Sequence, residues 1–121
     1  MSTQMQTYTA NDAIVLELDP IGAPVGSERD ATDILGEAFA HNATVIIIPA
    51  ERLVPDFLRL RSGLAGNFIQ KLQNYHCRLV IVGDISEAIA ASTALRDFVY
   101  ETNAIGNHRF VPNREALLAG L

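Results

Sequence analysis

A turn of small residues that leads into a predicted helix has the clearest chemical potential in this sequence. It runs from Ser62 through Gly63 to Gly66, and an amphipathic pattern follows it as far as Asn74. A helix N-terminus directs free backbone N–H groups and a partial positive charge outward, so it favours a bound anion. A serine hydroxyl at such a place is either an N-cap, worth about 1 kcal/mol, or a group that a kinase could phosphorylate. We therefore predict a capped helix start that could face an anion or carry a regulatory phosphate.

The two glycines of this turn require a reason, because glycine in the first turn of a helix costs about 0.5–1 kcal/mol relative to alanine. A closely approaching backbone, a bound anion or tight packing against the sheet would each favour Gly63 and Gly66. The segment does not end in the Gly-Lys-Ser or Gly-Lys-Thr of a phosphate-binding P-loop. The sequence alone leaves these three explanations open.

Two predicted connections follow the carboxyl ends of central strands, at residues 49–62 and 83–92. Ligands of parallel sheets collect beyond these strand ends, so we expect the two connections to form one rim. The polar groups and turn residues expected there are Arg59, Arg61, Ser62, Gly63, Gly66 and Asp84. Arg52 belongs with Arg59 and Arg61 in a small basic patch. An aspartate after a buried strand is also common as an ordinary turn residue or as a helix cap.

The cysteine and histidine residues give little support to catalysis or metal binding. Cys77 is the only cysteine, which excludes an internal disulfide and favours a reducing compartment, and we interpret it as a small buried hydrophobe. The histidines, at positions 41, 76 and 108, lack metal-ligand spacing, so we expect no metal and no cofactor. His76 and His108 could meet only if their strands are neighbours. No second carboxylate stands at a spacing that would pair with Asp84 for acid–base catalysis.

Hydrophobic periodicity predicts the elements that hold these groups in place. The predicted strands are residues 3–9, 13–18, 44–49, 77–82 and 109–111, and the predicted helices run from 27 or 30 to 42, from 62 to 74, from 92 to 103 and from 113 onward. The third and fourth strands are apolar on both faces, as in central parallel strands, whereas the second alternates and places Glu17 on a solvent-facing side. The order β-β-α-β-α-β-α-β-α predicts one α/β domain over residues 1–121, with a mixed, mainly parallel central sheet. Residues 1–8 are expected to fray.

The connection before the turn carries several large apolar residues. Leu53, Val54, Phe57 and Leu58 stand in a segment predicted to be irregular, where we expect them to be exposed. An exposed apolar patch of this kind is typical of an interface. A homodimer is therefore a reasonable expectation for this chain.

Motifs spread over almost the whole chain match a family pattern. They are Phe57, Ser62-Gly63-Leu64-Ala65-Gly66, Gln70-Lys71, Asn74-Tyr75, Leu79-Val80-Ile81-Val82-Gly83-Asp84 and Leu95-Arg96-Asp97-Phe98-Val99-Tyr100-Glu101-Thr102-Asn103. In combination they resemble the bacterial family called domain of unknown function 4180. That resemblance implies no catalytic residues, because the family has no established activity. This chain departs from the family pattern in having Ser62 where threonine is common, and in a slightly longer link around residues 87–91.

The element order and the turn at Ser62 are also similar to the STAS domain of anti-sigma-factor antagonists and sulphate transporters. In that family a serine at the start of the corresponding helix is the phosphorylation switch, and the resemblance assigns this role to Ser62. The aspartate that closely precedes the serine there is replaced here by Arg61, and extra residues separate the strand from the turn. The resemblance therefore implies a STAS-like fold, with weak recognition by a kinase of that kind.

Charge and composition narrow the classes of function. The net charge of −5 gives no general attraction to nucleic acid or to an anionic membrane. The apolar runs are too short to span a membrane and the N-terminus lacks a signal-peptide core, so we expect a cytoplasmic protein. Our first hypothesis is a non-enzymatic regulatory or protein-interaction module that works through the rim of residues 50–66 and 83–92. A binding module for a small anion or nucleotide is the alternative, and an enzyme ranks third.

Overall fold

The computed structural model describes residues 5–120, and their side chains as far as residue 117. The strands are β1 (Met5–Ala10), β2 (Ala13–Leu18), β3 (Val45–Pro49), β4 (Arg78–Val82) and β5 (Arg109–Val111). The α-helices are α1 (Glu28–His41), α2 (Leu64–Asn74), α3 (Ser86–Ala91), α4 (Thr93–Ile105) and α5 (Arg114–Gly120). Short 3-10 turns, η1 (Ala50–Arg52), η2 (Pro55–Leu58) and η3 (Leu60–Ser62), occupy the connection that precedes α2.

The five strands form one sheet in the order β1-β2-β3-β4-β5, in which β1 is antiparallel to β2 and the others run parallel. The β1–β2 turn needs left-handed backbone at Asn11 and Asp12, with φ of 50° and 65°, which these residue types tolerate. The predicted α/β class and the predicted order of elements are confirmed, except that α3 forms in a segment expected to be a link. Residues 5–8 pair with β2 instead of fraying, and residues 1–4 lie outside the described part.

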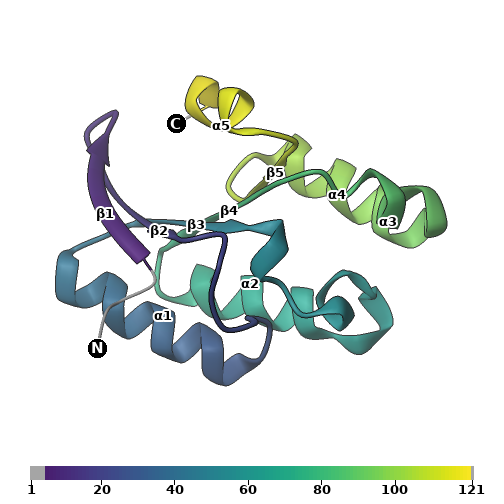
Figure 1. The fold of residues 1–121 in the computed structure, drawn as a ribbon, viewed down its shortest axis with the longest axis horizontal. Helices are drawn as coiled ribbons and strands as arrows, with labels where there is room; N and C mark the ends of the chain where they lie inside the picture. The colour runs from purple at the N-terminus through teal and green to yellow at the C-terminus, as the bar shows by residue number, and fades with distance from the viewer. Residues whose placement is uncertain (1–4, 121) are drawn as a thin grey trace.

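One face of the sheet packs against α1, α2 and α4. Figure 1 shows α1 and α2 together on one side of the sheet, with α5 on the other. Sequential parallel strands joined by right-handed crossovers place their helices on the same face, which explains this layer. Alternate strand residues point into the main core, including Leu16, Ile46, Leu79 and Phe110. The apolar stripes predicted on the helices, such as Phe68 of α2, close this core from the other side.

The connection between β3 and α2 belongs to the same core. Phe57 is fully buried and meets Phe68 edge-to-face, with ring centroids 5.6 Å apart. Leu53, Val54 and Leu58 are partly buried against the core. The prediction that these residues form an exposed patch is therefore wrong, because the 3-10 turns fold the segment back and direct its apolar side chains inward. The segment gives no support to a homodimer.

The opposite face of the sheet is closed by α5 and a small polar cluster. Its apolar residues are Val15, Val45, Ile47, Val80, Val111 and Leu117. Glu17 is only 6% exposed, which corrects the expectation that it faces solvent. The Tyr8 hydroxyl donates to its carboxylate at 2.5 Å, and the guanidinium of Arg114, at the start of α5, donates two hydrogen bonds. Hydrogen bonding to Glu17 raises the pKa of Arg114, and burial raises the pKa of Tyr8.

Candidate functional site

A surface groove separates the 3-10 turns before α2 from the pair α3–α4. Its volume is about 740 Å³, and its lining residues are Pro55, Leu58, Arg59, Leu60, Arg61, Ala88, Ala91, Ser92 and Ala94. One wall comes from residues 55–61 and the other from residues 88–94, so the two connections predicted to share a rim lie side by side. Most of the lining is apolar, and two cationic side chains stand on one wall.

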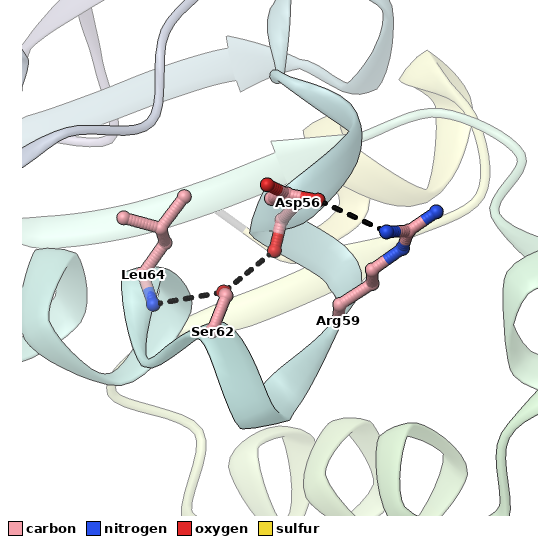
Figure 2. A network of polar contacts seen from close by, with 4 residues as sticks. All are labelled: Asp56, Arg59, Ser62 and Leu64. Atoms are coloured by element: carbon pink, nitrogen blue, oxygen red, sulfur yellow. Dashed lines mark hydrogen bonds and ion pairs between the residues drawn. The ribbon is translucent and has the colours of Figure 1, made fainter.

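These two cationic side chains are exposed. Nη1 of Arg59 lies 3.3 Å from a carboxylate oxygen of Asp56, as Figure 2 shows, and both side chains are more than half exposed. Exposed pairs of this kind contribute at most about 1 kcal/mol, so Arg59 can exchange this partner for another at little cost. Arg61 is exposed on the same wall. The arrangement leaves a local positive charge on a chain whose net charge is −5.

Arg52 does not join this patch, which corrects the sequence prediction. It is 5% exposed, and it donates from Nε to the carbonyl of Ala23 at 2.9 Å and from Nη1 to the carbonyl of Asp19 at 2.8 Å. The same loop is held by the N–H of Val25, which donates to the Arg52 carbonyl at 2.7 Å. Arg52 therefore ties the loop after β2 to η1 and has a structural role.

Ser62 is not the N-cap of α2, which corrects its predicted position. The N-cap is Gly63, and the helix begins at Leu64. The Ser62 hydroxyl donates to the carbonyl of Asp56 at 2.7 Å and accepts a hydrogen bond from the N–H of Leu64 at 3.2 Å (Figure 2). It therefore ties η2 to the first turn of α2. The hydroxyl uses its proton and an oxygen lone pair within the chain.

The two glycines of this turn differ in their backbone conformation and in their surroundings. Gly63 has a left-handed φ of 79°, a conformation that glycine adopts without steric cost. Gly66 is exposed in α2, and a Cβ at this position would meet nothing within 4 Å. Tight packing against the sheet therefore does not account for Gly66.

Asp84 lies in a second groove that adjoins the first. This groove is lined by Ala50, Glu51, Leu58, Gly83, Asp84, Ile85, Ser86, Glu87 and Ala88, and it shares Leu58 and Ala88 with the first. A carboxylate oxygen of Asp84 accepts a hydrogen bond from the N–H of Ser86 at 2.9 Å. Hydrogen bonds from the side chain and the backbone of Ser86 lower the pKa of Asp84. Asp84 thus acts as the turn or cap residue that its sequence position indicates.

The histidines at positions 76 and 108 and the cysteine at position 77 do not line either of these two grooves. The strands that follow His76 and His108 are neighbours, yet His76 is exposed in a turn with φ of 62°, whereas His108 is buried. Cys77 is buried as expected, and burial raises the pKa of its thiol. Within the described residues, no three His, Cys, Asp or Glu side chains lie close enough to hold a metal ion.

No helix in the described part of the chain has the length and apolar character to cross a bilayer.

Besides Arg52, sequence reasoning missed two other polar groups that the fold buries among the described residues. Glu17 is visible as a carboxylate within an apolar strand, but its partner Arg114 lies almost at the other end of the chain. His108 gives no sequence signal, because its partners Leu79 and Gln73 come from β4 and α2. Both groups depend on contacts between segments that no local pattern connects.

Comparison with known proteins identifies a family. Residues 10–121 match the family model described as Domain of unknown function (DUF4180). No curated protein and no solved structure matches the chain. The family match confirms the resemblance predicted from the motifs, while the likeness to STAS domains stays a prediction.

Proposed function

This chain belongs to the family of domains of unknown function 4180, and we propose from its geometry that it is a non-enzymatic protein-interaction module. The groove between residues 55–61 and 88–94 would hold a segment of a partner protein. The observation that supports this proposal is the composition of the groove. Apolar side chains form most of its lining, and Arg59 and Arg61 stand on one wall.

The groove fits a partner segment that combines small apolar residues with carboxylates. Leu58, Leu60 and Ala91 offer apolar surface, whose burial would drive association. Arg59 and Arg61 would meet the carboxylates, which speeds encounter and sets the orientation of the segment. The acidic end of the segment would point away from the carboxylates of the adjoining groove, because like charges repel.

Selection of peptides from a random displayed library tests the proposal directly. Peptides selected on the wild-type protein should combine an apolar stretch with acidic residues, and should bind Arg61→Glu at least about tenfold more weakly. Arg96→Glu is the matched control, because Arg96 is exposed on α4 and does not line the groove. Selected peptides that lack acidic residues, or that bind both variants equally, would refute the proposal.

Regulation at Ser62 forms part of the same proposal. Its hydroxyl ties η2 to α2 directly beside the groove wall. Phosphorylation would remove the proton that it donates to the Asp56 carbonyl and would add negative charge next to Arg61. Ser62→Ala should fold at a cost of about 1 kcal/mol for the lost hydrogen bonds of the hydroxyl, yet weaken binding of the selected peptides. Unchanged peptide affinity would show that Ser62 does not shape the groove.

A small anion or nucleotide is the second candidate ligand, and the presence of two arginines on one wall favours it. A thermal-shift screen with inorganic phosphate and nucleotides separates this candidate from peptide binding. A rise in Tm that disappears in Arg61→Ala would favour an anion-binding module. No rise, together with acidic selected peptides, would favour the interaction module.

A further inference from the structure

A cleft that shares no lining residue with either of the two grooves opens between α2 and α4. Its volume is about 310 Å³, and its lining residues are Gly66, Ile69, Gln70, Gln73, Phe98, Thr102, Ile105, Asn107 and His108. The lining combines apolar side chains with carboxamides, a hydroxyl and an imidazole. No Asp, Glu, Lys or Arg is among these residues. The cleft thus presents hydrogen-bonding groups without formal charge.

The imidazole of His108 lies at the polar part of this cleft, and its hydrogen bonds define its protonation state. It is 6% exposed, and its Nδ1 accepts a hydrogen bond from the backbone N–H of Leu79 at 3.0 Å. A ring nitrogen that accepts carries no proton, so the hydrogen-bond network assigns the proton to Nε2 and makes the imidazole neutral. Nε2 lies 3.1 Å from Oε1 of Gln73 and 3.2 Å from the side-chain nitrogen of Asn107. Nε2–H therefore donates to Oε1 of Gln73 and holds that carboxamide in place at the cleft, whereas the side-chain nitrogen of Asn107, itself a donor, only lies beside the ring.

The cleft also contains Gly66, which the packing of α2 leaves unexplained. A Cβ at this position would meet nothing within 4 Å, although glycine is unfavourable inside a helix. A glycine that lines a cleft lets a ligand approach the helix backbone closely. Gly36 of α1 has the same open surroundings but lies outside the cleft, so it offers a matched comparison.

We propose that this cleft binds a small uncharged ligand with a planar hydrogen-bonding group, such as an amide or the edge of a nucleobase. The carboxamides of Gln73 and Asn107 offer donors and acceptors to such a group. Phe98, Ile69 and Ile105 offer apolar surface to its ring. A charged ligand would lose hydration without gaining an ion-pair partner among the lining residues. This site is independent of the proposed interaction groove.

Probes of one shape and different charge test the proposal: benzamide, benzoate and benzamidine. Each is titrated into ¹⁵N-labelled protein while NMR follows the side-chain amide signals of Gln73 and Asn107. Benzamide should shift these signals with a Kd on the order of 1 mM, as expected for a small fragment. Benzoate and benzamidine should bind at least about tenfold more weakly, because no charged residue lines the cleft and the nearby guanidinium of Arg78 already donates to the carbonyls of Gly106 and Asn107.

Two alanine variants locate the binding site. Gly66→Ala adds a methyl group at the cleft and should weaken benzamide about tenfold, whereas Gly36→Ala should leave its affinity unchanged. Both variants should keep dispersed backbone signals, because the added Cβ meets nothing in either place. Equal binding of benzamide and benzoate, or full benzamide affinity in Gly66→Ala, would overturn the proposal. So would titrations of benzamide, uracil and adenine that leave the Gln73 and Asn107 signals unshifted.

Discussion

Gly63 and Gly66 lie close together at the start of α2, in different backbone conformations. Gly63 has φ of 79°, where alanine should cost about 1–2 kcal/mol. Gly66 is helical with open space around it, so alanine should stabilise the protein by about 0.5–1 kcal/mol. Urea unfolding of Gly63→Ala and Gly66→Ala measures both free energies. Changes of the same sign in the two variants would contradict this assignment.

His108 makes the stability of the protein depend on pH. Burial lowers the pKa of His108 below its ordinary value of 6.5, and the charge of Arg78 lowers it further. The unfolded chain therefore binds a proton at a pH where the folded chain does not. The contribution of neutral His108 to the free energy of unfolding is fully present above pH 6.5. This contribution is lost as the pH falls from 6.5 through the lowered pKa of the folded state.

A variant without the titrating ring tests this dependence. His108→Asn keeps an acceptor close to the position of Nδ1 but does not titrate. Its free energy of unfolding should fall less steeply than that of the wild type between about pH 7.5 and about pH 5. Urea unfolding at a series of pH values gives both slopes. Equal slopes would show that His108 does not contribute.

At the scale of the elements, the attachment of α5 depends on a charged contact between the two ends of the chain. Arg114 donates to Glu17, whose side chain is 8% exposed, whereas that of Arg114 is 51% exposed. Arg114→Ala would leave the Glu17 carboxylate buried without a countercharge. Because Arg114 itself is half exposed, we expect a loss of about 1–3 kcal/mol in the free energy of unfolding.

A double variant separates the loss of the charge pair from the burial of an unpaired charge. Glu17→Met combined with Arg114→Met removes both charges and keeps apolar volume, so it should be more stable than Arg114→Ala. Chemical unfolding of the two proteins gives the order. The opposite order would indicate that the guanidinium stem, and not the buried charge, holds α5.

The short elements show what periodicity misses at this scale. A helical pattern needs several turns before it can be recognised, and α3 spans only Ser86–Ala91. The alanine-rich segment therefore reads as a link, although Asp84 before it has the character of a cap. Pro55 does indicate a helical turn, and η2 begins there. The inward direction of Phe57 does not follow from that signal, because it depends on how three successive turns fold back.

At the scale of the whole molecule, the two cores share one sheet. Val15 and Leu16 are adjacent in β2 and belong to opposite cores, so disruption of one core disturbs the strands of the other. We therefore expect one cooperative unfolding transition. Far-UV circular dichroism and tyrosine fluorescence, to which Tyr8 contributes from the second face, should give coincident curves. Separate transitions would show that the α5 layer unfolds by itself.

The sequence by itself determined the α/β class, the order of the strands and main helices, and the family. These features follow from local patterns: apolar runs, helical spacing and short motifs are complete within one segment. The same local pattern located the turn before α2, although it indicated Ser62 and not Gly63 as the capping residue. Local pattern does not state which segment covers a given side chain.

Only the tertiary structure decided which side chains are covered and what they meet. Arg52 and Glu17 are charged, yet distant carbonyls and a guanidinium supply their partners inside the protein. Gly66, in contrast, is left uncovered, because a cleft lies between α2 and α4 at this position. Burial of a polar group depends on partners from other segments, since an unpaired one costs free energy. The groove and the cleft, like these partners, exist only once separate segments have come together.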